Sequence, residues 1–228
     1  MAPFGRPFLS ALSEQLYNTK HQNFITVSDS VRNALLIWKT ILMCNRELPF
    51  NFILGRLPRA KNEWFIDAST NFGCGGLVGR DYFMVENSQL KKSKFCGKYI
   101  RFEEVKIAYR ELISAVIAFV YFSEKSPSSL VRINCDNTNV VSWLNKSRCS
   151  KKLGYHLLSV IELLKLQYNL KTSVLFIESS SNKSADALSR GKIPQWLKRR
   201  GVRQTVDIRK IDTILSNPLL FWKTTLSV

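Results

Sequence analysis

The stretch Trp64-Phe65-Ile66-Asp67-Ala68-Ser69-Thr70 is a short apolar run that carries one carboxylate. It continues into Asn71-Phe72-Gly73-Cys74-Gly75-Gly76, a turn rich in glycine, which leads into further apolar residues. Apolar runs bounded by turn-forming residues predict neighbouring strands. Asp is depleted in strands, because its side chain competes for backbone hydrogen bonds and is costly to bury. Asp67 is therefore a water-facing residue of an edge strand, the start of an early turn, or a carboxylate with a function.

The composition is that of a globular chain with a strong excess of positive charge. Of its 228 residues, 45% are hydrophobic and 22% are charged, enough apolar material for a sizeable core. Thirty-four Lys and Arg against 17 Asp and Glu give a net charge of +17. Such a surface favours nucleic acid, since binding releases the counterions condensed on the phosphates. Acidic membrane surfaces are the alternative, but we find no polybasic amphipathic helix or lipidation motif and expect no membrane partner.

The cysteines and the termini exclude several other classes. The five cysteines are odd in number and form no CxxC pair, and with two histidines they favour neither a disulfide framework nor a zinc site. The segment 1–15 mixes charged residues with isolated apolar ones and has no signal-peptide core. The longest apolar run, 112–122, falls short of the ~20 residues that span a bilayer. We expect an intracellular protein, cytoplasmic or nuclear.

Three segments are predicted along the chain. Residues 1–60 form a helical connection segment, with a helix that begins near Pro7 and a second from Val31 to about Cys44. Residues 61–191 form an α/β domain. Residues 192–228 form a basic helical extension, in which the cluster Lys198-Arg199-Arg200 is a phosphate patch, part of a nuclear signal, or a solvated basic face.

The central domain is predicted to contain a mixed five-stranded sheet. Short turns between the first three strands favour an antiparallel meander, and a strand reached through a helix is parallel to an earlier one. We expect the strand order 3-2-1-4-5 with helices on both faces. The predicted strands are 64–69, then 76–79 with 82–85 across a turn or bulge at Arg80-Asp81, then 98–102, 130–135 and 172–178. The predicted helices are 105–123, 138–145 and 154–168, with a short one within 182–191.

Four carboxylates follow one another on these elements: Asp67, Glu111, Asp136 and Asp186. Parallel strands present their carboxyl ends at one edge of a sheet, where ligands bind in open α/β folds. Small residues after Glu111 allow its helix to lie close to the sheet. Each acid also has an ordinary explanation. Glu111 would lie on a solvent-exposed helix face beside a base such as Arg110, and Asp136 would cap a helix. Asp186 would stabilise its helix as an acidic residue in the first turn.

In this order the motifs resemble the ribonuclease H family of retroelements. The matching residues are Asp67-Ala68-Ser69, the helical Glu111, Cys135-Asp136-Asn137 and, most specifically, Asn182-Lys183-Ser184-Ala185-Asp186-Ala187-Leu188-Ser189-Arg190. The opening Phe4-Gly5-Arg6-Pro7-Phe8-Leu9 and the helix around Trp38 resemble the connection that follows a reverse transcriptase palm. Among retroelements, the likeness is to the DIRS-like, tyrosine-recombinase group.

This resemblance implies a ribonuclease H-like fold and a metal-dependent endoribonuclease that cuts the RNA strand of RNA–DNA hybrids, beside the reverse transcriptase portion of a retrotransposon polyprotein. It implies two Mg²⁺ ions, with Mn²⁺ as a substitute. Asp67 and Asp136 would be the central ligands, Glu111 would complete one site and Asp186 the other. Ser69 and Asn137 would contact phosphate or 2′-hydroxyl groups, or act as local turn formers.

Two departures from the family pattern leave other functions open. The loop 176–181 lacks the histidine that many members carry, and 147–154 is too short for the family's extra basic helix. One alternative is a catalytically inactive nucleic-acid-binding module with the same fold, from a domesticated or fragmentary element. Another is a two-metal nuclease or integrase, although the Ala-Asp-x-Leu-Ser-Arg motif is not typical of integrases.

Overall fold

The computed structural model describes residues 6–19, 24–43, 62–90, 94–95, 98–99, 102–149 and 151–216. The chain divides into two compact units, 1–58 and 59–228. In the first unit, α1 (Arg6–Thr19) packs against α2 (Asp29–Met43), which confirms both predicted helices. The Gln15 side chain links them to the loop between, since its Oε1 accepts hydrogen bonds from the backbone N–H and the hydroxyl of Ser28. The expected helix end at Cys44 lies outside the described residues.

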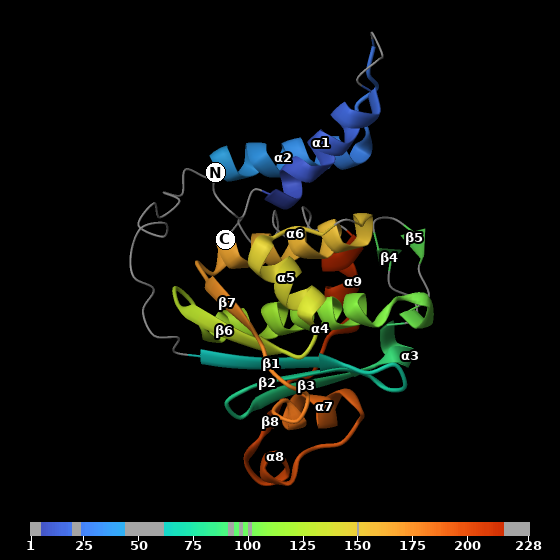
Figure 1. Ribbon diagram of the computed structural model, residues 1–228. Helices are drawn as coiled ribbons and strands as arrows, with labels where there is room; N and C mark the ends of the chain where they lie inside the picture. The colour runs from blue at the N-terminus through green and yellow to red at the C-terminus, as the bar shows by residue number, and fades with distance from the viewer. Residues whose placement is uncertain are drawn as a thin grey trace. The chain divides into compact units, whose positions relative to one another are not determined.

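The second unit is built on a mixed sheet, which the described residues form with six strands (Figure 1). Their order is β7-β6-β1-β2-β3-β8. The β1–β2 and β2–β3 pairs are antiparallel, whereas β6 runs parallel to β1 and β7 parallel to β6. The strands are β1 (Asn62–Ala68), β2 (Gly73–Val78), β3 (Asp81–Glu86), β6 (Leu130–Cys135), β7 (Lys171–Phe176) and β8 (Val202–Arg203). The predicted α/β class and the order 3-2-1-4-5 are confirmed, with β8 added beyond β3.

The third strand was predicted in the wrong place. The expected strand 98–102 is not in the main sheet, because β5 (Lys98–Tyr99) pairs instead with β4 (Lys94–Phe95) in a separate two-stranded sheet. The third strand of the main sheet is β3, which corresponds to the predicted segment 82–85 that follows the turn or bulge at Arg80-Asp81. Gly79 has φ +54° and forms a two-residue turn with Arg80, so that Val78 pairs with Asp81. A glycine at the first position of such a turn matches the twist of a hairpin, and the chain therefore reverses here.

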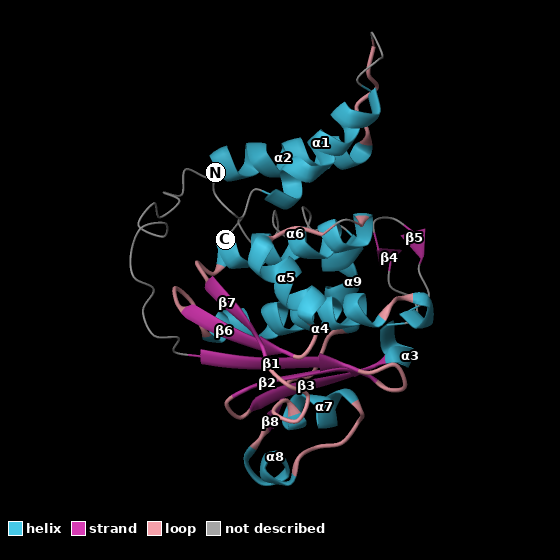
Figure 2. Cartoon of the chain, in the orientation of Figure 1, coloured by secondary structure: helices cyan, strands magenta, loops and turns pink. Residues whose placement is uncertain are grey.

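Helices cover both faces of the sheet (Figure 2). One face carries α4 (Ile107–Phe122) and α6 (Lys152–Gln167), and the large core lies between them and the strands. In this core the Trp64 ring meets the edges of Phe119 and Phe122. The other face carries α7 (Lys183–Ser189) and α8 (Gln195–Arg200) over a smaller core. The remaining helical segments are α3 (Asn87–Leu90), η3 (Phe102–Glu104), η4 (Ser123–Lys125), α5 (Thr138–Lys146) and α9 (Ile208–Ser216).

The basic segment after residue 191 shares this core. β8 pairs with β3 through Val202 and Arg203, and α9 buries Ile211, Ile214 and Leu215 in the large core. Up to residue 216, the predicted extension is therefore part of the compact unit 59–228. Within the described ranges, no helix combines the length and the apolar character needed to cross a membrane.

Candidate active site

Asp67 lies in β1, the strand between β2 and β6, and its side chain is only 5% exposed. Alternate side chains of a strand point to opposite faces. Trp64, Ile66 and Ala68 join the core beneath α4, whereas Phe65 packs on the side of α7. The Ser189 hydroxyl of α7 donates a hydrogen bond to Asp67 Oδ2. Asp67 is thus neither an edge-strand residue nor a turn residue, and its burial needs another explanation.

Glu111 comes from the opposite face of the sheet, on α4. It is 5% exposed and accepts hydrogen bonds from Asn137 Nδ2 at 3.1 Å and from the Cys135 thiol at 3.4 Å. The neighbouring Arg110 is also buried and donates to the carbonyls of Val105 and Thr70 at 2.8 and 3.0 Å. The alternative that Glu111 lies on a solvent-exposed helix face is therefore wrong, because the side chains of Glu111 and Arg110 are both buried.

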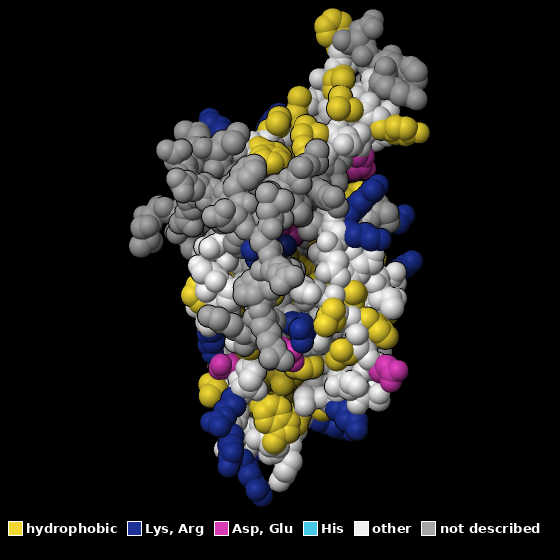
Figure 3. Space-filling view, turned by 60° about the vertical axis from the view of Figure 1, so that its left-hand side comes forward, with side chains coloured by type: hydrophobic (Ala, Val, Ile, Leu, Met, Phe, Trp, Pro, Cys, Tyr) yellow, Lys and Arg dark blue, Asp and Glu magenta, His cyan; other side chains and the backbone are white. Residues whose placement is uncertain are grey.

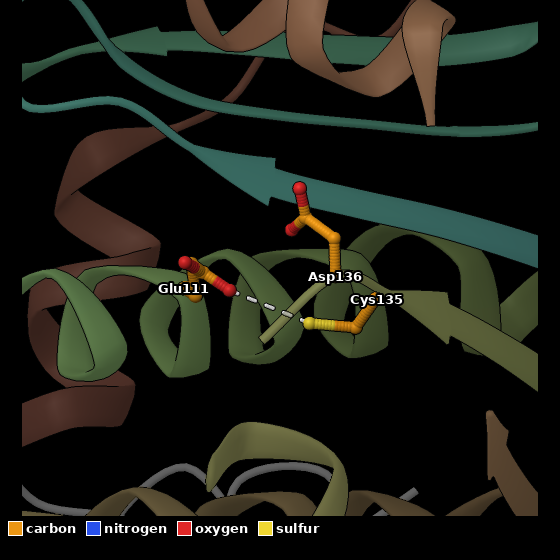
Figure 4. Close-up of side chains that lie close together, drawn as sticks. All are labelled: Glu111, Cys135 and Asp136. Atoms are coloured by element: carbon orange, nitrogen blue, oxygen red, sulfur yellow. Dashed lines mark hydrogen bonds between the residues drawn. The ribbon is translucent and has the colours of Figure 1, made fainter. Parts of the chain in front are cut away.

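Asp136 follows directly after β6 and is half-buried. Its Oδ2 accepts a hydrogen bond of 2.7 Å from the Ser179 hydroxyl. Asn137, not Asp136, caps α5, since Asn137 Oδ1 accepts from the backbone N–H groups of Asn139 and Val140. The capping explanation for Asp136 is therefore wrong. Ligand atoms of Glu111, Cys135 and Asp136 all lie within 4.8 Å of one another, between α4 and the end of β6 (Figure 4).

Asp186 lies on α7, whose close approach to the sheet depends on a glycine. Gly75 is the partner of Asp67 in the β1–β2 register. A Cβ at Gly75 would lie 2.5 Å from the Ser189 nitrogen and 2.7 Å from the Leu188 carbonyl carbon. Only a residue without a side chain permits this contact. The glycine thus allows the backbone of α7 to rest against β2 opposite Asp67.

Two neighbours hold the ends of α7. Asp186 Oδ1 accepts from Arg190 Nε and Nη2, at 2.8 and 2.7 Å, in an i,i+4 ion pair. At the start of the helix the buried Asn182 donates through Nδ2 to the Ile66 carbonyl at 3.0 Å. These contacts fix Asp186 on the same side of β1 as Asp67.

The electrostatics of the cluster show that the carboxylates act on one another. Burial raises the pKa of Asp67 to about 6, the Ser189 hydrogen bond opposes this shift, and the charges of Asp136 and Asp186 add to it. Burial likewise raises the pKa of Glu111 to about 7, against the Asn137 hydrogen bond and with the help of Asp136 and Asp67. Desolvation and neighbouring like charges both disfavour the ionised form. Glu111 and Asp136 form the close pair of this cluster, and Asp67 lies near enough to feel the charges of Asp136 and Asp186.

This donor set fits a hard divalent cation. Carboxylate oxygens are the ligands that Mg²⁺ and Mn²⁺ take in proteins. Cys135 does not add a soft thiolate ligand to the site. Burial raises the pKa of its thiol far above the usual range, and the thiol donates a hydrogen bond to Glu111. A bound cation would stabilise the ionised forms of Asp67 and Glu111, whose pKa values are raised by burial and by neighbouring carboxylates.

The two predicted nucleic-acid contacts have structural partners. The Ser69 hydroxyl donates to the Ser189 carbonyl at 2.6 Å and accepts from the N–H groups of Phe72 and Gly73. Asn137 caps α5 and at the same time donates to Glu111. These contacts favour the turn-forming alternative, and a contact with nucleic acid stays a prediction for both residues.

Four residues of the cluster had been given no role from the sequence: Cys135, Ser179, Ser189 and Arg190. Each forms a hydrogen bond to one of the carboxylates. Ser189 and Arg190 belong to the motif around Asp186, and Cys135 belongs to Cys135-Asp136-Asn137. The motifs therefore point to these three positions but assign them no role. Ser179 had no such signal.

The sheet and its helices define an α/β protein with a mixed sheet in the order β7-β6-β1-β2-β3-β8 and helices on both faces. No protein-family model matches the sequence, and no curated protein matches it. The solved structures include a similar one, the crystal structure of RNase H1 from the halophilic archaeon Halobacterium salinarum NRC-1. It is 13% identical, covers 56% of this chain and 92% of its own, and superposes with a TM-score of 0.40.

Proposed function

We propose that the chain is a metal-dependent endonuclease that hydrolyses the RNA strand of RNA–DNA hybrids. The observation that carries the proposal is the cluster of Glu111 and Asp136 with Asp67 and Asp186 near it, in which burial and neighbouring carboxylates raise the pKa values of Asp67 and Glu111. Burying carboxylates side by side is costly for a fold. A binding protein gains nothing from it, whereas a hydrolase that uses divalent cations needs it.

In this proposal, Asp67 and Asp136 would be the central cation ligands, Glu111 would complete one site and Asp186 the other. When bound, two divalent ions activate the attacking water and stabilise the departing 3′ oxygen. Mg²⁺ is the expected ion and Mn²⁺ a substitute, since both take oxygen ligands and leave positions for water and phosphate.

The neighbouring side chains keep these carboxylates in position. The Ser189 hydroxyl orients Asp67, the Ser179 hydroxyl orients Asp136, and Asn137 with Cys135 orients Glu111. Arg190 holds Asp186 at the exposed rim. We assign Arg190 a second role there, which is to attract a phosphate of the substrate strand towards the carboxylates.

The substrate class and the biological setting rest on the sequence. A net charge of +17 favours a polyanion, and a 2′-hydroxyl distinguishes RNA from DNA at a given site. The motifs around Asp67, Asp136 and Asp186 resemble those of retroelement ribonucleases H. We therefore place this activity within retrotransposon reverse transcription, beside the reverse transcriptase portion of the same polyprotein.

The test is a cleavage assay with the purified chain and Mg²⁺ on an RNA–DNA hybrid, duplex RNA and duplex DNA of one sequence. We expect cleavage of the RNA strand of the hybrid alone, and its loss with a chelator. Asp67→Asn should abolish cleavage and leave hybrid binding intact, because it removes a cation ligand and no basic residue.

Asp207→Asn is the matched control, because Asp207 caps α9 and Asn caps helices as well as Asp does. We expect this variant to cut at the normal rate. If the purified chain leaves the hybrid uncut with Mg²⁺ and with Mn²⁺ at every salt concentration, the enzymatic proposal is wrong.

The second candidate is a catalytically inactive nucleic-acid-binding module. The ion pair between Arg190 and Asp186 favours it, since a carboxylate already held by Arg has less need of a cation. This module would bind hybrids with a strong dependence on salt and without cleavage, and Asp67→Asn would change nothing.

A further inference from the structure

A hollow of about 660 Å³ lies at the other end of β1 from the carboxylates. It opens beside the first residues of β1, the β2–β3 turn, and the segment that leads into α7. This volume is within the range of small-molecule sites. Its lining includes Asn62, Phe65, Leu77, Arg80, Lys183 and Trp196.

Aromatic and apolar side chains form part of the wall. Trp196 on α8 is 47% exposed, and its indole N–H donates to the Ser184 hydroxyl at 3.4 Å. Phe65 is half-buried against the smaller core, and Leu77 lies beside it. A large aromatic side chain that is half-exposed and fixed at one edge offers a surface on which a base can stack.

Two basic side chains at the rim of the hollow, Arg80 and Lys183, are available to bind a phosphate. Lys125 pairs with Asp81 at 2.6 Å, and Glu63 pairs with Arg132 at 2.8 Å. Within the described part of the chain, Arg80 and Lys183 form no ion pair, and both are exposed. The lower part of Figure 3 corresponds to the region of α7 and α8 in Figure 1. Hydrophobic side chains gather there between groups of Lys and Arg.

A buried polar atom among the lining residues also lacks a partner. Asn182 is fully buried and donates through Nδ2 to the Ile66 carbonyl. Its Oδ1 has no hydrogen-bond partner among the described residues. A buried acceptor without a partner costs free energy unless a ligand or water satisfies it.

The hollow and two of the carboxylates, Asp67 and Asp186, lie on one face of the sheet. Phe65 and Asp67 are two residues apart on β1 and point to the same side, about 7 Å from each other along the strand. α7 lies over this face and contributes to both places, with Ser184 at the hollow and with Asp186 and Ser189 at the carboxylates. A nucleic-acid strand that leaves the carboxylates along this face therefore reaches the hollow.

We propose that the hollow is a second nucleic-acid contact site, which receives one unpaired nucleotide of a strand that continues beyond the catalytic cleft. The base stacks on Trp196 beside Phe65, and Arg80 and Lys183 bind its phosphate. This inference rests on the proposed function, since it assumes that a hybrid occupies the cleft. The chemistry recognised is an aromatic base with a phosphate, and the occupant is a single-stranded extension of the substrate.

The test measures binding without cleavage, by fluorescence anisotropy of labelled oligonucleotides with the full chain in EDTA. A blunt RNA–DNA hybrid is compared with the same hybrid carrying a short single-stranded overhang at either end. We expect one of the overhangs to tighten binding about tenfold, the scale of one stacked base. In Trp196→Ala this gain should vanish, while the blunt hybrid binds as before.

Two further variants separate stacking and phosphate binding from general effects. Trp196→Phe keeps an aromatic surface and should keep most of the gain, and this controls for a folding defect in Trp196→Ala. The double variant Arg80→Gln/Lys183→Gln should lower the affinity for the overhang more than that for the blunt hybrid. The matched double variant Arg148→Gln/Lys151→Gln removes two exposed cations of the α5–α6 connection and should weaken both ligands equally.

Two further binding experiments identify the source of the nucleotide and distinguish failure of this inference from failure of the proposed function. Adenosine monophosphate should compete only at concentrations far above those of the overhang, and equal potency would overturn the strand as occupant. A free single strand should bind in a manner sensitive to Trp196→Ala even if blunt hybrid is neither bound nor cut, so that failure of the proposed function is recognised separately. If no overhang and no single strand gains affinity through Trp196, the hollow is not a nucleotide site.

Discussion

The helices α4 and α7 each bring one carboxylate to the cluster, but they are held against the sheet by different forces. α4 has 16 residues, and the side chains that flank Glu111 within it, such as Leu112 and Ile113, are fully buried. α7 has seven residues, of which Ala185, Leu188 and Ser189 are buried. Apolar burial therefore determines the position of Glu111, whereas Asp186 depends on a close backbone contact and a few hydrogen bonds.

This difference carries over to the two acids themselves. Glu111 is embedded in the core side of the cluster, and burial raises its pKa to about 7. The Asp186 side chain is 35% exposed and paired with Arg190. The carboxylate on the well-packed helix is thus the costly one to ionise. The carboxylate on the short helix is more exposed and easier to displace.

The largest effect should come from disturbing the contact between α7 and the sheet. In Gly75→Ala the new methyl group would meet the backbone of Leu188 and Ser189 at 2.5–2.7 Å, so α7 must move away. We expect a loss of hybrid cleavage of about 100-fold or more, since a shift near 1 Å in a catalytic group has this effect. The free energy of unfolding should fall by about 1–3 kcal/mol, as overpacking does in cores. Cleavage rates and urea unfolding measure the two.

Gly79→Asn is the control for this variant. Gly79 has φ +54°, which Asn tolerates, and no atom lies within 4 Å of a Cβ placed there. Its cleavage rate should remain near that of the unaltered chain. If Gly75→Ala also cuts normally, α7 is less dependent on the close contact than its geometry indicates.

A second comparison exchanges each acid for its amide in the absence of metal. Glu111→Gln removes the buried charge, and at pH 7.5 in EDTA it should raise the free energy of unfolding by up to about 3 kcal/mol, the size of the pKa shift from 4.5 to about 7. Asp186→Asn breaks an exposed ion pair and should lower stability slightly or leave it unchanged. Both variants should lose Mg²⁺-dependent cleavage. Equal stability changes in the two would contradict the contrast between the helices.

The pH dependence of stability follows from the same raised pKa values. An acid whose pKa is higher in the folded than in the unfolded chain stabilises the fold while protonated, and the folded chain loses this contribution as pH rises. For Asp67 and Glu111 the loss extends from about pH 4 to about pH 7. The melting temperature in EDTA should therefore contain a component that falls over this range, and Asp67→Asn should reduce it. Adding Mg²⁺ above pH 7 should restore the melting temperature, and no restoration would argue against cation binding.

The sequence predicted the elements and missed the contacts that join them. Apolar runs and helical spacing identified β1, β6, α4 and α6, because each is long enough for its periodicity to be visible. They did not identify β8, which has two residues, and they left open whether Arg80-Asp81 is a turn or a bulge. The bond between Ser189 and Asp67 joins residues 122 positions apart, and the approach of α7 over Gly75 depends on tertiary packing. The four acids were found because a motif marks each one, whereas the hollow beside Trp196 has no local signature.

The smallest effect should come from the exposed rim of α7. Arg190→Gln removes the ion pair with Asp186 but leaves the buried contacts of Ser189 and Leu188 in place. Because an exposed pair contributes little to stability, the melting temperature should hardly change. Cleavage should fall a few-fold, mostly through weaker substrate binding at high salt, if Arg190 attracts a phosphate as proposed. Arg199→Gln, an exposed arginine at the end of α8, is the matched control and should leave the blunt-hybrid rate unaltered. An increase in cleavage with Arg190→Gln would mean that the arginine competes with the cation for Asp186, and the inactive binding module would then gain support.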